Sequence, residues 1–294
     1  MPALGEWQYA LDDFVFGYGT AYPVNQFDVS YPELRTQDVD APRADGITMG
    51  IDRQGGMTVS FDMEVVGQGE ADTVDLIEEI RRAWYGTDKR LVPQSYQTLS
   101  YRTGGTGEQR RMYGRGRAWT PASLENLHVG YVPAAAQFAC RDGFFYSDTE
   151  FSDTAGIIPD DTGGLIGDLI GPIYASTFGA GTSGLIVGGT EPAWAVTRVN
   201  GPIAYFTVEF VGQFTYGMDV ELGRDESILV DPQPWQRSAR MSNGGNAAGL
   251  FTGDSAWLAD MRLPPGHHNV ILRGYDPTGT SSVETYWRSV RASL

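Results

Sequence analysis

Apolar and polar residues alternate strictly over residues 57–65, in the segment MTVSFDMEV. Successive side chains of a β-strand point to opposite faces, so this pattern predicts a half-buried antiparallel strand. The predicted core face carries five apolar side chains, namely Met57, Val59, Phe61, Met63 and Val65. We expect this segment to belong to the first sheet of the protein.

The apolar spacing changes to a helical period over residues 72–85. The apolar stripe consists of Leu76, Ile77, Ile80, Ala83 and Trp84. Asp72 is placed to cap the first turn, and Gly86 can end the helix in a left-handed conformation. Glu78 and Arg82 stand four residues apart, in the order that favours an ion pair. We expect one amphipathic helix lying on a sheet.

Further strands are predicted around short turns. Residues 99–102 and 111–115 flank the glycine-rich turn 103–107, which is the pattern of a hairpin, and 134–140 is another strand candidate. The last third of the chain contains short strand-like runs separated by turn residues, over 206–210, 218–222, 227–231, 270–274 and 283–287. Strands of this length and spacing favour a β-sandwich.

Residues 152–190 interrupt this order. Glycines and two prolines divide short apolar pieces there, so we expect a boundary followed by irregular, turn-rich structure. We therefore divide the chain into a first domain, residues 1–150, with one helix on its sheet, and a second domain, residues 151–294, built as a β-sandwich. The expected fold class is mostly β.

The charge of the chain limits its partners. Its 294 residues include 37 acidic and 21 basic side chains, a net charge of −16. This charge disfavours sequence-independent DNA binding and adsorption to anionic membranes, because both depend on Lys and Arg. A single cysteine, Cys140, excludes an intrachain disulfide and a cysteine-based zinc site. The chain shows no signal-peptide pattern and no apolar run of membrane-spanning length, so we expect cytoplasmic synthesis and no membrane insertion.

Patterns typical of catalysis are absent from the sequence. There is no G-x-S-x-G elbow, the glycines at 104–107 lack the lysine of a P-loop, and the acidic pairs do not follow the EF-hand spacing. His267 and His268 follow the turn 264–266, so we expect both to lie exposed in a loop. A hydrolase would need paired carboxylates at a recognisable spacing. We expect no enzymatic activity, no metal and no cofactor.

Four arginines form a basic cluster in this acidic chain, namely Arg110, Arg111, Arg115 and Arg117. In one interpretation they contact a phosphate or an acidic partner, and an acidic neighbouring subunit, which Glu78 and Arg82 of the predicted helix would also contact, is favoured over nucleic acid. In the other, they pair with carboxylates of the same chain, which are in excess.

Tryptophans suggest a second candidate function. Trp194, Trp235, Trp257 and Trp287 all lie in the predicted second domain. Exposed aromatic rings on a sandwich can stack on sugars, and we take Trp235 and Trp257 as the candidates. The alternative is burial in the core, which is the commoner fate of aromatic side chains. The chain would then be a carbohydrate-binding module used in host adhesion.

The order of several short motifs points to a known family. The strand 112–115 is followed by Phe144-Phe145-Tyr146-Ser147, then Gly201-Pro202, Leu229-Val230-Asp231, and the segment 263–270 with Pro265-Gly266. This succession resembles the distal tail proteins of long-tailed (siphovirus-type) bacteriophages, often labelled minor tail proteins in phages of actinobacteria. The chain departs from the family pattern at Gly143, where a proline is usual, and at Asn269, which two histidines displace.

The resemblance implies a structural role in the virion. Family members form hexameric rings at the tail tip, with a ring-forming first domain and a galectin-like or carbohydrate-module-like second domain. The implied partners are other copies of the chain, the tail tube protein, the tape measure protein, and the hub and receptor-binding proteins. DNA passes only in transit. We further hypothesise that part of the negative charge lines the channel and repels this DNA.

Overall fold

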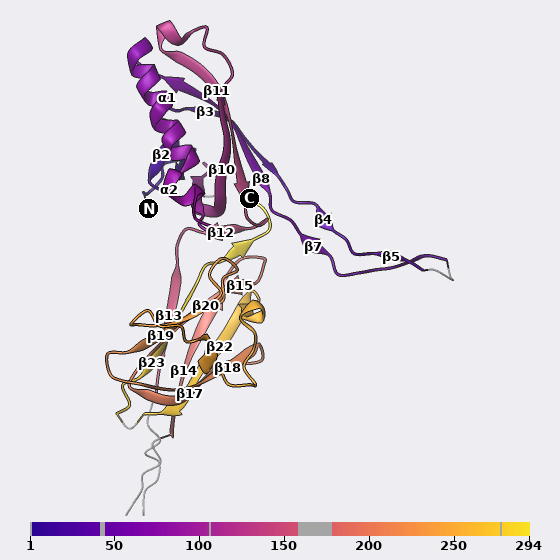
Figure 1. Ribbon diagram of the computed structural model, residues 1–294, viewed down its shortest axis with the longest axis vertical. Helices are drawn as coiled ribbons and strands as arrows, with labels where there is room; N and C mark the ends of the chain where they lie inside the picture. The colour runs from indigo at the N-terminus through magenta and orange to yellow at the C-terminus, as the bar shows by residue number, and fades with distance from the viewer. Residues whose placement is uncertain (1, 42–44, 106, 158–177, 277) are drawn as a thin grey trace, which may run out of the picture. The chain divides into compact units, whose positions relative to one another are not determined.

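The computed structural model describes residues 2–41, 45–105, 107–157, 178–276 and 278–294. Contacts divide the chain into two compact units. Unit 1 contains Met1–Thr149 with Ala292–Leu294, and unit 2 contains Glu150–Arg291. Both units are built mainly of β-strands (Figure 1).

Unit 1 is built on an antiparallel sheet with the strand order β2-β1-β9-β10-β11-β8-β3. The strands are β1 (Gln8–Leu11), β2 (Phe14–Gly17), β3 (Val24–Ser30), β8 (Thr58–Val66), β9 (Gln97–Arg102), β10 (Gln109–Pro121) and β11 (Tyr131–Cys140), and β12 (Phe145–Ser147) also pairs with β10. The two strands of the predicted hairpin, β9 and β10, pair antiparallel. The strand predicted over 57–65 is β8, and its five apolar side chains are buried as expected.

One helix, α1 (Glu70–Tyr85), covers a face of this sheet (Figure 1). Ile80 and Trp84 are buried from its apolar stripe, and the Trp84 ring meets Phe16 and Phe61 edge to face. Gly86 ends the helix in the left-handed conformation, as predicted. A short second helix, α2 (Thr87–Arg90), follows directly.

Two predictions about this helix were wrong. Its N-cap is Gly69, three residues before Asp72, and the helix begins at Glu70. The φ of Gly69 is 101°, a conformation that glycine adopts readily. Asp72 lies in the first turn, where its carboxylate accepts a hydrogen bond from the Gln68 amide at 2.7 Å. The Glu78–Arg82 pair is not among the ion pairs of the described residues, and both side chains are exposed to water, where such a pair gains little.

Two long strand-containing segments leave the sheet between β3 and β8, and we call them, residues 34–41 and 45–54, the arm (Figure 1). It contains β4 (Leu34–Arg35) paired with β7 (Arg53–Gln54), and β5 (Val39–Asp40) paired with β6 (Ile47–Thr48). The side chains of these four strands are exposed. The Asp38 carboxylate accepts a hydrogen bond from the Gly50 amide at 2.9 Å and links the two sides.

Unit 2 contains two larger sheets, as a sandwich requires. One has the order β13-β23-β16-β19-β20 and the other β14-β22-β17-β18. The bounds are β13 (Phe151–Gly156), β14 (Phe178–Val187), β16 (Val196–Asn200), β17 (Ile203–Phe210), β18 (Phe214–Leu222), β19 (Ser227–Asp231), β20 (Ser238–Met241), β22 (Gly266–Tyr275) and β23 (Ser282–Trp287). A buried hydrogen bond of 2.5 Å between the hydroxyls of Thr197 and Tyr216 joins β16 to β18, so the sheets face each other. Three shorter strands complete the unit, β15 (Ala193–Trp194), which pairs with β21 (Arg262–Leu263), and β24 (Val290–Arg291).

The structure corrects two expectations in this unit. The glycine-rich stretch 152–190 is not irregular where it is described, since it forms β13 and β14, and β14 pairs with β22 along its whole length. Residues 158–177, with most of its apolar pieces, lie outside the described residues. His267 and His268 lie in β22 and not in a loop. His268 is buried, with its Nε2 2.7 Å from the Pro264 carbonyl oxygen.

Candidate functional site

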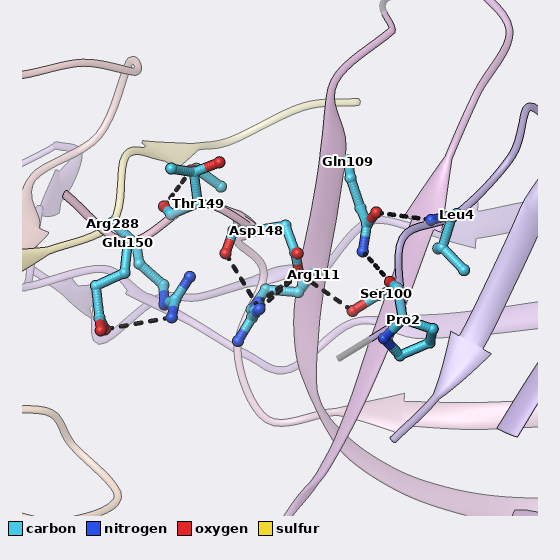
Figure 2. Close-up of polar contacts among 10 residues, drawn as sticks. Pro2, Leu4, Ser100, Gln109, Arg111, Asp148, Thr149, Glu150 and Arg288 are labelled. Atoms are coloured by element: carbon cyan, nitrogen blue, oxygen red, sulfur yellow. Dashed lines mark hydrogen bonds and ion pairs between the residues drawn. The ribbon is translucent and has the colours of Figure 1, made fainter. Parts of the chain in front are cut away.

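The arginine cluster separates into buried and exposed members. Arg110 is almost fully buried and contacts the Glu108 carboxylate and the Ser293 carbonyl oxygen. Arg111 donates to the Asp148 carboxylate at 2.6 and 2.9 Å and also to the Asp148 carbonyl oxygen (Figure 2). Both therefore satisfy the interpretation that these arginines pair within the chain. Next to Arg110, Gln109 holds the N-terminal segment through Pro2 and Leu4 (Figure 2).

Arg115 and Arg117 stand beside a basic pocket of about 300 Å³. The Arg115 guanidinium donates to three carbonyl oxygens, those of Arg90, Val92 and Ser95, at 2.6–3.2 Å, so it fixes the segment after α2. Arg117 is exposed. Arg141, which the sequence analysis missed, also lines the pocket. Its guanidinium lies over the Tyr96 ring, 5.3 Å from the ring centroid. The pocket concentrates positive charge in an acidic chain.

The arm is the largest feature that the sequence did not reveal. Five of its large apolar side chains are exposed, Leu34, Val39, Ile47, Met49 and Ile51, with exposed fractions from 51 to 74%. A two-stranded hairpin without a sheet or helix behind it is only marginally stable in water. Contiguous exposed apolar surface is typical of interaction sites.

The two candidate tryptophans differ in exposure. Trp235 is half-buried, and Trp257 has 80% of its surface exposed. Trp257 lines a pocket of about 470 Å³ in unit 2, together with Phe251, Leu258 and Arg237. The geometry therefore favours Trp257 over Trp235 as a stacking platform.

The part of the chain that the structure describes contains no group of three or more His, Cys, Asp and Glu side chains that could hold a metal ion. Cys140 is buried, and burial raises the pKa of its thiol. Burial also raises the pKa of Asp142, which accepts hydrogen bonds from the Tyr146 hydroxyl and the Phe144 amide and closes a tight turn. No helix among the described residues is long and apolar enough to cross a membrane.

Comparison with known proteins gives structural matches only. No family model matches the chain, and no curated protein does. The SPP1 Dit protein, described as a paradigm of the hub adsorption apparatus in phages infecting Gram-positive bacteria, matches with a TM-score of 0.61 and 13% identity, over 96% of this chain and 98% of that chain.

Two structures of the phage P2 baseplate in its activated conformation also match. The one with Ca has a TM-score of 0.54 at 12% identity, and the one with Sr has 0.53 at 13%. Both cover 96% of this chain and 97% of the other chain. This chain therefore shares its fold with the SPP1 Dit protein and with a chain of the P2 baseplate.

Proposed function

We propose that this protein is a structural component of a bacteriophage tail tip, where copies of the chain form a hexameric ring. Two independent lines support the proposal. The motif order resembles that of distal tail proteins, and the fold is similar to that of the SPP1 Dit protein along nearly the whole chain. In this role the ring joins the tail tube to the hub and receptor-binding proteins, lets DNA pass, and has the tape measure protein as a further partner.

The exposed arm is the observation that best supports self-assembly. Its five apolar side chains have no core to cover within unit 1, and burial against a neighbouring copy would remove them from water. A surface that reaches from one copy to the next is what a closed ring requires, because a ring interface joins two different patches.

Charge provides the second element of the interface. Of the six residues predicted to contact a neighbour, Arg117, Arg82 and Glu78 are exposed, whereas Arg110, Arg111 and Arg115 already serve the fold of unit 1. We place Arg117 and the basic pocket against carboxylates of the next copy. The arm supplies such carboxylates at Asp38, Asp40 and Asp52.

The first test is the oligomeric state of the full purified chain. We expect native mass spectrometry to find a hexamer of the 32.1 kDa chain, and negative-stain class averages to show a ring with a central channel. Labelling with antibodies against the chain should decorate the tail tip of intact virions. A strictly monomeric chain that is missing from virions would overturn the proposal.

A second candidate function is carbohydrate binding in host adhesion, and the exposure of Trp257 favours it. The two functions are compatible, because one resides in unit 1 and the other in unit 2. Binding to a glycan array that is lost in Trp257→Ala would support the second function.

A further inference from the structure

We propose that the pocket at Trp257 binds a neutral sugar, stacked by its C–H face on the indole ring. The inference rests on the second candidate function and not on the ring. Its first observation is that Trp257 is 80% exposed, the largest exposed fraction of any large apolar side chain in the described ranges. A tryptophan is seldom left so open to water unless it contacts a partner.

The loop that presents Trp257 is held against strand β18. The Thr252 amide donates to the Gly217 carbonyl oxygen at 3.0 Å, and the Ala256 amide donates to that of Thr215 at 2.9 Å. In return, the Gly217 amide donates to the Ser255 hydroxyl at 3.0 Å. A Cβ at residue 217 would stand 2.9 Å from the Thr252 hydroxyl, so glycine permits this close approach. The backbone of this loop is therefore held in place, which reduces the conformational entropy lost on binding.

The pocket beside the ring has the size and lining of a small-molecule site. Its volume of about 470 Å³ lies in the usual range for such sites, roughly 300–1,000 Å³. Small side chains line much of it, namely Ala248, Gly253, Ser255, Ala256 and Ala259, and leave space next to the indole. A ring-sized ligand can therefore enter the pocket and lie along the tryptophan.

Arg237 supplies the charged group of the pocket. Its backbone has a φ of 38°, in the left-handed region that non-glycine residues rarely adopt, and such conformations cluster at ligand sites. The Arg237 side chain is exposed and takes part in none of the ion pairs among the described residues. Its N–H groups can donate to hydroxyl oxygens of a bound sugar.

The surrounding charge selects a neutral ligand. Asp254 and Asp260 lie three residues on either side of Trp257, and both are exposed. They add to the net charge of −16, which disfavours binding of a polyanionic glycan. Neutral hexoses and N-acetylhexosamines fit this combination of an aromatic face and a guanidinium in an acidic protein.

The test is a titration of the full-length protein with methyl glycosides of glucose, galactose, mannose and N-acetylglucosamine, followed by tryptophan fluorescence. We expect one of them to bind with a Kd of order 1 mM, and Trp257→Ala to weaken binding by about tenfold or more. Trp257→Phe should retain part of the affinity, and Arg237→Ala should weaken it by about threefold. Tyr205→Ala is the matched control, because Tyr205 is an exposed aromatic residue of unit 2 outside this pocket.

The outcomes distinguish failure of the sugar-binding inference from failure of the proposed hexameric assembly. Thermal melts and native mass of every variant are measured in the same samples, and we expect Trp257→Ala to keep the fold and the oligomeric state of the parent. The inference is overturned if no neutral glycoside binds, if only glucuronate or another anionic sugar binds, or if Trp257→Ala binds like the parent. It is also overturned if Trp257→Ala dissociates the oligomer, because the indole of Trp257 would then contact a neighbouring protein surface and not a sugar.

Discussion

Gly116 lies next to the last turn of α1. A Cβ at this position would stand 2.1 Å from the Trp84 carbonyl oxygen, and Trp84 itself is fully buried with its Nε1 donating to the Gln137 carbonyl oxygen. We predict that Gly116→Ala lowers the free energy of unfolding by about 1–3 kcal/mol, since the helix must move off the sheet. Chemical denaturation measures this change in the free energy of unfolding. Gly105→Ala, which meets nothing within 4 Å, is the control and should change stability by less than about 0.5 kcal/mol.

The Arg111–Asp148 pair offers a test of whether this arginine is structural. Both side chains are largely buried, with exposed fractions of 12 and 22%. Arg111→Met leaves the Asp148 carboxylate without its strongest donor, and we predict a loss of about 1–3 kcal/mol in unfolding experiments. Glu150→Gln removes the charge of the Arg288–Glu150 pair, in which the glutamate is half exposed, and should cost only about 0–1 kcal/mol. Equal effects would argue against a structural role for Arg111.

Asp231 at the end of β19 gives a pH-dependent prediction. Burial raises the pKa of this carboxyl to about 6 from 3.8, although the Gln233 amide donates to it. The folded chain therefore holds a proton that the unfolded chain releases. The resulting stabilisation is fully present below pH 3.8 and is lost as the pH rises through about 6. We predict that Asp231→Asn is more stable than the parent at about pH 7.5, by up to about 3 kcal/mol, and that the difference vanishes in acid.

Asp276 is the contrasting residue for that experiment. Burial alone would raise its pKa, but hydrogen bonds from Ser281 and Thr278 outweigh burial and hold the pKa at about 2. Its stabilisation is present above pH 3.8 and is lost as the pH falls toward 2. Asp276→Asn should therefore destabilise the protein at neutral pH. If both substitutions shift the melting temperature in the same direction there, the assignment for Asp231 is wrong.

Among the elements, those with a periodic apolar face were predictable from the sequence. The strand over 57–65 and the stripe from Leu76 to Trp84 each bury that face, so the period of the sequence matches the structure. The arm was missed because its apolar side chains cover nothing within the chain. Strand β14 was missed because its glycines suggest turns, whereas pairing with β22 imposes an extended conformation. At the candidate sites, the exposure of Trp257 and the burial of Arg110 depend on tertiary contacts that no local pattern records.

The arm can be removed without loss of the core. Replacing residues 35–53 by a short turn deletes exposed strands only, so we predict that the free energy of unfolding of the monomer changes by less than about 0.5 kcal/mol. We also predict that light scattering no longer detects the oligomer, since the proposed apolar contact between copies would be lost. Leu124→Gln, an exposed apolar position of unit 1 outside the arm, should leave assembly intact.

For the whole molecule, the net charge of −16 makes a prediction about DNA. If the wall of the proposed channel is acidic, double-stranded DNA should not bind the assembled protein even at about 20 mM salt, where electrostatic binding is strongest. Gel-shift and filter-binding assays measure this. Retention of DNA that weakens steeply with added salt would show a basic channel and contradict the hypothesis.

The arm also determines how long an unassembled chain survives. Arg35 and Arg53 stand in its short exposed strands, and exposed loop-like segments are preferred sites of proteolytic cleavage. A free chain is thus open to trypsin at both positions, whereas a chain whose arm is covered by a neighbour is protected. In the proposed role, proteases of the infected cell would remove chains that remain unassembled, so the amount of intact protein would reflect the rate of assembly.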